Sequence, residues 1–360
     1  MIDLREHGGP FGAGKYRKGS VINEDDSLEV VTTGGQISFN GPGNISNGAN
    51  IQGAHLAPDG YLYVITSASS SPYPTYIVKV NPADLAVISY TQIGTWTQGV
   101  ICAVGDDYYM YFCVRYGGVY KFDLRTLTQV WTYPFGDSTC YGYDLAISGD
   151  RVVIGTTGNL AQVSVLVLTK DGGLVWQKEG IQTSNKFVAI GNDGSIYVSA
   201  SNTSTSSSYP VFFKYDAAGN LIYSNKIAEY GSYPTTRIGV NPYTGKLYTW
   251  IQYVIWELDP ATGLKMPRVG SKTFGSSSAA VRFIFDKQGH IIMASNATST
   301  GSSATEVVRV RLSDMTMRYN TEGMAGNLLK SITPYGDDKL IVGGLQQMCM
   351  MGRLNVFKMK

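Results

Sequence analysis

Short apolar runs separated by turn residues recur along most of the chain, and residues 186–228 contain the clearest unit. Four apolar runs lie within it, at residues 187–190, 195–200, 211–215 and 221–227. An Asn-Asp-Gly turn, a Ser/Thr-rich loop and a second turn separate them. Runs of this length bounded by Gly, Asn and Asp are typical of β-strands, so the unit predicts an antiparallel meander of four strands.

The pattern of this unit returns six more times, at intervals of 42 to 51 residues, and its second strand is the clearest marker. Second strands are predicted at residues 61–64, 109–112, 151–154, 195–198, 246–249, 290–293 and 339–342. One meander cannot bury both of its faces alone, so we expect the units to stack on one another. The spacing fits the blade of a β-propeller, which has about 40 to 50 residues.

Third and outer strands follow the second strand in most repeats. Third strands are predicted at residues 77–80, 119–122, 165–168, 211–215, 254–258, 307–311 and 354–357. Turns such as Asp-Pro-Ala-Thr-Gly at residues 259–263 come next, with the chemistry expected where a chain reverses. In five repeats the outer strand then has a large aromatic residue, which is Tyr90, Trp131, Trp176, Tyr223 or Tyr319.

The two ends of the repeat array are both incomplete. The last repeat lacks a fourth strand after residues 354–360, and residues 27–33 have the outer-strand pattern without the three strands that should precede it. Joining them would remove the exposed edges of an open array. The sequence therefore predicts an all-β, seven-bladed β-propeller over residues 27–360, with four-stranded antiparallel blades closed by an N-terminal outer strand. Residues 1–26 are Gly-rich and aperiodic, and they predict an extended arm.

The turn and outer-strand pattern resembles a known repeat family. The Asp-Pro-Ala-Thr-Gly turn at 259–263, the Lys-Asp-Gly-Gly turn at 170–173 and the aromatic residues Trp131 and Trp176 are similar to the PQQ-type, quinoprotein-like β-propeller repeat. This resemblance covers residues 27–360. It implies the fold and hardly any activity, since one fold hosts many functions.

The N-terminal segment resembles the short leaders of some virion proteins of tailed bacteriophages. The similar residues are Ile-Asp-Leu-Arg-Glu-His-Gly-Gly at 2–9, Phe11-Gly12 and Lys-Tyr-Arg-Lys-Gly at 15–19. The resemblance implies that the arm contacts neighbouring subunits. The arm residues expected to bind a partner are Arg5, His7, Phe11, Lys15, Tyr16, Arg17 and Lys18.

Composition and charge argue against several classes of function. The net charge is +2 and only 16% of residues are charged, which argues against a nucleic-acid partner. The longest apolar runs are strand-sized, so no membrane insertion is expected. The N-terminus has no apolar segment of a secretion signal, so we expect assembly in the cytoplasm of a host and localisation in a virion. The four cysteines form no CxxC pair and are expected to be reduced and buried; Cys102 and Cys113 flank a hairpin turn and are expected to face each other.

No catalytic constellation is visible in the sequence, so we expect no enzyme, no catalytic residue, no metal site and no cofactor. His7, His55 and His290 lie far apart, and neither GxSxG nor HExxH is present. Quinoprotein catalysis is disfavoured because no two cysteines are adjacent. A scaffold of the WD type is disfavoured because its Gly-His and Trp-Asp repeat signatures are absent.

Two surface features suggest a binding face. Basic residues lie near the starts of consecutive innermost strands, where they form either an anion-attracting channel mouth or a charge-neutralised rim: Lys186, Arg237, Arg282 and Lys330. Long Ser/Thr-rich loops at 67–75, 199–210 and 294–305 include Tyr73 and Tyr209. These loops serve either to contact sugars or another protein, or as plain spacers.

The sequence favours a non-enzymatic structural and interaction protein, a tail, collar or capsid-decorating component of a tailed phage. Its expected partners are other virion proteins or copies of itself, with a host-surface glycan as a further candidate. The alternative is a soluble propeller enzyme or a carbohydrate-binding lectin with its site at the channel mouth, at Lys186, Arg237 and Arg282.

Overall fold

The protein is all-β in the computed structural model, as predicted. The structure describes residues 28–37, 50–67, 73–96, 99–136, 140–157, 163–181, 186–202, 209–227, 237–251, 254–266, 278–286, 288–297, 305–312, 316–320, 327–335, 339–346 and 351–359. Strands and turns account for these residues, and none of them belongs to a helix that could cross a membrane. The strands form six four-stranded antiparallel sheets and one three-stranded sheet.

The chain divides into two compact units, and the sheets are distributed between them. Unit 1 comprises the described residues within 1–70, 78–90 and 269–360, and unit 2 those within 71–77 and 91–268. The boundary passes through the sheet of β2 (Asn50–Leu56), β3 (Leu62–Ser67), β4 (Tyr73–Val80) and β5 (Val87–Trp96).

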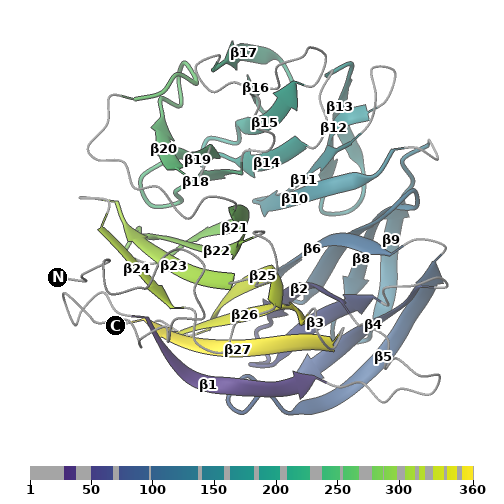
Figure 1. Ribbon diagram of the computed structural model, residues 1–360. Helices are drawn as coiled ribbons and strands as arrows, with labels where there is room; N and C mark the ends of the chain where they lie inside the picture. Colours follow the sequence, from purple (N-terminus) through teal and green to yellow (C-terminus); the bar gives the residue numbers. More distant parts are fainter. Residues whose placement is uncertain are drawn as a thin grey trace. The chain divides into compact units, whose positions relative to one another are not determined.

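Unit 2 contains four meanders in which the strands pair in chain order (Figure 1). The first has β6 (Val100–Asp106), β7 (Tyr109–Val114), β8 (Gly118–Asp123) and β9 (Thr128–Tyr133). The second has β10 (Gly142–Ser148), β11 (Arg151–Thr156), β12 (Val163–Thr169) and β13 (Leu174–Glu179). The third has β14 (Lys186–Ile190), β15 (Ile196–Asn202), β16 (Tyr209–Tyr215) and β17 (Leu221–Lys226). The fourth has β18 (Ile238–Val240), β19 (Leu247–Ile251) and β20 (Val254–Leu258).

The fourth meander of unit 2 has three strands where four were predicted. After the turn at 259–263 the chain meets β20 only through a bridge between Leu258 and Lys265, and Met266 donates its N–H to the Glu257 carbonyl. Pro267 follows directly in the sequence, and a proline has no N–H with which to extend such a ladder. Residues 267–277 lie outside the described part of the chain.

Unit 1 joins the two ends of the repeat array in one sheet. Its order is β1 (Leu28–Ile37), β27 (Met351–Met359), β26 (Lys339–Gln346) and β25 (Asn327–Tyr335). The purple β1 runs along the yellow β27 in Figure 1, with Leu28 opposite Met359 and Ile37 opposite Gly352. The predicted pairing of the first strand with the last is confirmed. The second sheet of unit 1 has β21 (Ser278–Phe285), β22 (Ile291–Ala297), β23 (Thr305–Arg311) and β24 (Thr316–Asn320).

The core of unit 2 lies between neighbouring sheets. Middle strands such as β7 and β11 are buried along nearly their whole length, whereas outer strands such as β9 are mostly exposed. Tyr111 of the first meander packs with Leu145 and Ile154 of the second, and all three are buried. Full burial of one such side chain stabilises the fold by roughly 1.5 to 3 kcal/mol. Stacking of sheets therefore supplies the burial that a lone meander lacks.

The aromatic residues of the outer strands pack on turns of the neighbouring sheets in unit 2. Trp176 in β13 donates its indole N–H to the Ala217 carbonyl, at 3.1 Å, in the turn of the next sheet. Its ring also covers Gly219 in that turn, since a Cβ at Gly219 would lie 2.8 Å from the ring. The same packing of an outer aromatic ring on a turn glycine is found for Trp131 on Gly172 and for Tyr223 on Gly263.

Replacement of Gly219 by alanine is expected to lower the free energy of unfolding by about 2 kcal/mol, because the φ of +89° disfavours a Cβ and Trp176 occupies its place. Gly245→Ala is the matched control. Gly245 has a φ of +71° but no atom within 4 Å of the added Cβ, so only the backbone penalty of about 1 kcal/mol applies. Urea unfolding measures both, and equal losses would contradict the packing of Trp176 on Gly219.

Candidate functional site

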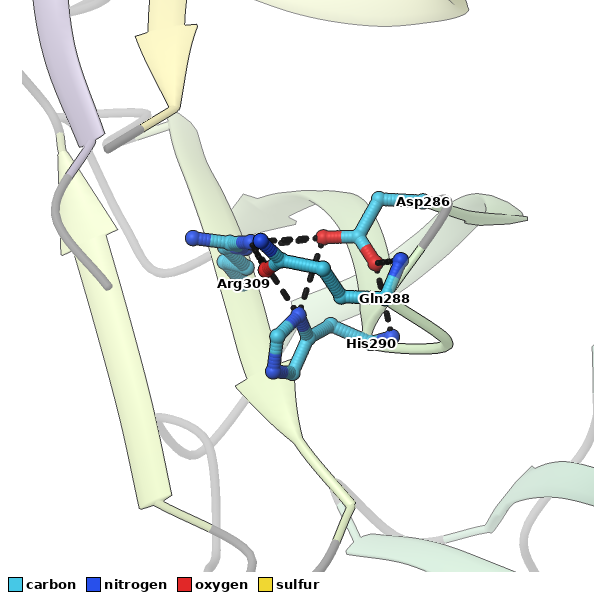
Figure 2. A network of polar contacts seen from close by, with 4 residues as sticks. All are labelled: Asp286, Gln288, His290 and Arg309. Carbon is cyan, nitrogen blue, oxygen red and sulfur yellow. Dashed lines mark hydrogen bonds and ion pairs between the residues drawn. The ribbon is translucent and has the colours of Figure 1, made fainter. Parts of the chain in front are cut away.

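The most concentrated group of buried polar side chains lies where β21 turns into β22 (Figure 2). Asp286 follows β21, His290 precedes β22, and Arg309 reaches the turn from β23. Arg309 donates to Asp286 Oδ2 from Nε at 2.9 Å and from Nη2 at 2.8 Å. Nδ1 of His290 lies 3.0 Å from the same oxygen. Gln288 also contacts Arg309, with its Oε1 at 2.5 Å from Nη2.

The local sequence dictates the position of the carboxylate. Asp286 Oδ1 accepts the backbone N–H groups of Gln288 and His290, both at 2.9 Å. Gly289 takes the left-handed conformation, with a φ of +81°, that closes the turn. An aspartate that caps its own turn in this way keeps its second oxygen directed toward the neighbouring strand. The strand register places Arg309 opposite Ile292, beside that oxygen.

The charges of this group are strongly coupled. Asp286, His290 and Arg309 are 9%, 8% and 4% exposed. Burial alone would raise the pKa of Asp286, but the hydrogen bonds from His290 and Arg309 outweigh it and hold the pKa below its usual range. His290 Nδ1 lies 3.1 Å from Arg309 Nη2, and a guanidinium only donates. The role of His290 Nδ1 therefore depends on the tautomer of the neutral ring. With the ring proton on Nε2, Nδ1 accepts a hydrogen bond from Arg309; with the proton on Nδ1, it donates to Asp286.

Related contacts in other sheets argue that this group is structural. In each case a long polar or cationic side chain of the third strand reaches the turn between the first two strands. The pairs are Lys79 with Asp59 at 2.9 Å, Lys214 with Asp193 at 4.0 Å, and Arg309 with Gln288. Asp286 gives Arg309 a second partner in addition to this recurring contact between the third strand and the turn. A carboxylate held twice by one guanidinium is a poor proton acceptor, so the group has little capacity for acid–base chemistry.

The basic residues of unit 2 that were predicted at a channel mouth are buried or paired. Lys186, at the start of β14, is 0% exposed, and burial lowers its pKa to about 8. Arg237 forms an ion pair with Asp144 at 3.0 Å and stacks over the Phe187 ring at 4.1 Å. Asp144 also accepts the N–H of Val188 at 3.1 Å. Arg237 is thus neutralised by Asp144 and Lys186 is covered by the fold, so neither side chain favours an open cationic mouth.

The other predicted site residues are only partly described. Arg282 lies in β21 and Lys330 in β25, both in unit 1, and their side chains are outside the described part. Tyr73 and Tyr209 begin β4 and β16 and are half-buried, and Lys226 Nζ lies 3.4 Å from the centre of the Tyr209 ring. The partner-binding residues predicted between Arg5 and Lys18, and the central parts of the three Ser/Thr-rich loops, lie outside the described residues.

The cysteines of unit 2 behave as predicted. Cys102 and Cys113 face each other across β6 and β7, and these two thiols and that of Cys140 are buried and form no disulfide. A hydrogen bond with Cys102 and burial raise the pKa of the Cys113 thiol well above its ordinary value. A thiol with a raised pKa is a weak nucleophile, so Cys113 fills space in the core.

One surface group of unit 2 was not predicted from the sequence. Arg115 and Tyr116 form the turn between β7 and β8, and Tyr141 precedes β10. The Arg115 guanidinium lies 5.0 Å from the centre of the Tyr116 ring and 4.9 Å from that of Tyr141. The two rings meet edge to face at 5.6 Å. The available signal was Tyr116 ahead of two glycines in a tight turn, a position that usually takes a smaller residue.

Solved structures share the fold of this chain. The crystal structure of the WD40 β-propeller domain of Doa1 is similar over 93% of this chain and 98% of that chain, with a TM-score of 0.65 and 10% sequence identity. The computationally designed Ika8 protein is similar over 92% of this chain and 100% of its own, with a TM-score of 0.55 and 11% identity. No protein-family model and no curated protein matches the sequence. At these identities the likeness shows the β-propeller fold alone.

Proposed function

We propose that the protein is a non-enzymatic interaction module with a seven-bladed β-propeller body of the PQQ-like repeat type. In this proposal it is a structural component of a tailed-phage virion, anchored through residues 1–26. The repeat pattern, the pairing of β1 with β27 and the propeller likeness of solved structures support the body. The leader resemblance supports the anchor.

The observation that carries the interaction role is the Arg115, Tyr116 and Tyr141 surface. Tyrosine and arginine are among the residue types enriched where proteins bind one another. By contrast, Asp286 and Arg237 are engaged in ion pairs with their own fold. The alternative of a lectin or enzyme at the channel mouth depends on Lys186, Arg237 and Arg282. Lys186 is buried and Arg237 is paired, and we therefore favour the interaction module; the Arg282 side chain lies outside the described part of the chain.

The test follows the chain through particle assembly. Producing cells receive the full-length chain, a chain lacking residues 2–20, or a control in which a Gly/Ser stretch of equal length replaces them. Particles are separated on a density gradient, and the chain is quantified by peptide mass spectrometry. We expect only the full-length chain to co-sediment at a fixed ratio. All three should share one melting temperature, because β1 begins at Leu28.

Two outcomes would count against the proposal. Normal incorporation of the truncated chain would show that the arm is not the anchor. Recovery of the full-length chain only as a free small species would contradict the virion assignment.

A further inference from the structure

Arg115 is a half-buried cation without a carboxylate partner among the described residues. Its side chain makes one hydrogen bond there, from Nη2 to the Tyr116 hydroxyl at 3.1 Å. Its Nε–H is covered from solvent and meets no acceptor. A guanidinium has five N–H donors, and a desolvated guanidinium is stabilised strongly by an anion. Within the described part of the chain, no carboxylate therefore neutralises the positive charge of the turn between β7 and β8.

A second arginine in the same sheet shows the neutralised arrangement. Arg125, in the turn between β8 and β9, lies 5.1 Å from the centre of the Tyr108 ring and 5.8 Å from that of Tyr109. Unlike Arg115, it forms an ion pair with Asp123 at 2.5 Å. Both arginines lie over two tyrosine rings, and among the described residues only Arg125 has a carboxylate partner. The comparison indicates that a carboxylate is the group that fits Arg115.

A strained backbone conformation at Tyr116 holds the Arg115 group in place. The N–H of Gly117 donates to the Val114 carbonyl at 3.0 Å, which closes a turn with Tyr116 in its third position. Tyr116 has a φ of +60°, a conformation that glycine or asparagine adopts far more readily than a bulky residue. Its ring, 38% exposed, is thereby fixed beside Arg115. Strain that is retained at an exposed aromatic residue points to a function for the ring.

We infer that Arg115, Tyr116 and Tyr141 bind a carboxylate group in an acidic segment of a partner protein. The carboxylate binds at the Nη edge of Arg115, and the two tyrosine rings flank the bound chain. A guanidinium that already lies against two rings loses little freedom on binding, so the site is preorganised. This inference rests on the proposed function and specifies the chemistry of the partner.

The test uses the full chain and three fluorescent probes at low salt: a hexaglutamate peptide, a hexaglutamine peptide and a glucuronate-containing oligosaccharide. We expect hexaglutamate to bind and hexaglutamine not to bind. Arg115→Gln should weaken hexaglutamate binding at least tenfold. Tyr116→Asn should also weaken it, and this variant is expected to fold well because asparagine tolerates a positive φ. Arg125→Gln, the matched control, should leave the affinity within twofold.

Three results with the probes would overturn the inference. No binding of hexaglutamate, or equal weakening by Arg115→Gln and Arg125→Gln, would mean that no specific carboxylate site exists. Tighter binding of the oligosaccharide than of the peptide would assign the site to a glycan. A chain that co-sediments with particles yet ignores hexaglutamate would refute this site alone, whereas a chain that binds hexaglutamate but never co-sediments would refute the virion assignment alone.

Discussion

Replacement of Arg309 by methionine is expected to lower the free energy of unfolding by about 3 to 5 kcal/mol at pH 7, because it leaves a buried carboxylate without its cation. Asp286 is 9% exposed, and Arg309 supplies two of its hydrogen bonds. His290 remains, but it cannot replace the permanent charge of the guanidinium. Urea unfolding at pH 7 measures the loss.

The matched control is Arg151→Met, since Arg151 pairs with an exposed Asp150 at 3.2 Å. An exposed pair contributes about 0 to 1 kcal/mol, so this variant should be nearly neutral. Asp286→Asn combined with Arg309→Met should recover part of the loss, because the unpaired charge is then gone. A loss below 1 kcal/mol for Arg309→Met alone would show that Asp286 is solvated or otherwise neutralised.

Acid should weaken the same contact. Because the folded pKa of Asp286 lies below its usual range, the folded state binds its proton less readily than the unfolded state does. The stabilisation from the ionised Asp286 carboxylate is complete above the pKa of about 4 that this group has in the unfolded state. It is lost as pH falls through the lower pKa of Asp286 in the folded state. Asp286→Asn should therefore show a shallower decline of stability below pH 4 than the natural chain.

Replacement of Lys186 by methionine is expected to remove a rise of about 3 kcal/mol in the free energy of unfolding between pH 8 and 10.5, because the folded and unfolded states of the natural chain lose the Lys186 proton at different pH values. Burial lowers the folded pKa of Lys186 from 10.5 to about 8. Below pH 8 Lys186 is protonated in both states, so its contribution to stability does not vary with pH there. Between pH 8 and 10.5 the folded state releases the proton before the unfolded state does, so stability rises with pH.

The difference in the free energy of unfolding between Lys186→Met and the natural chain should therefore change between pH 8 and 10.5 in favour of the natural chain, and stay constant below pH 8. Lys246→Met serves as control, since the Lys246 side chain is 53% exposed and its replacement should give a difference that varies little over this range. Urea unfolding at pH 7, 8.5 and 10 measures this difference. A difference that is the same at all three pH values would contradict the lowered pKa of Lys186.

Local patterns predicted the strands and several contacts within sheets. The turn residues and the alternation of apolar side chains locate β14 to β17, and hairpin geometry brings Cys102 opposite Cys113. The aromatic residues of the outer strands were also apparent, although their glycine partners lie about 40 residues further along the chain. Patterns with a period of two residues and short turns are set by neighbouring residues, and a single sequence contains that information.

The contacts that were missed depend on packing between sheets. Lys186 has the sequence context of a rim charge, yet it is buried because Gly155 lets β11 approach the Lys186 backbone without a Cβ in between. Asp144 and Arg237 are 93 residues apart and meet through the stacking of three sheets. Their pairing follows from the positions of whole strands, which no local pattern states.

The pairing of β1 with β27 has a consequence for synthesis on the ribosome. More than 300 residues separate these strands, and β1 is made first. At elongation rates of about 5 to 20 residues per second, β1 waits roughly 20 to 60 seconds for its partner. During that time its edge is open to other nascent chains, and the β-branched residues of Val30 to Thr33 suit such pairing. Translation speed, as well as stability, therefore bears on how much of the protein reaches its native state.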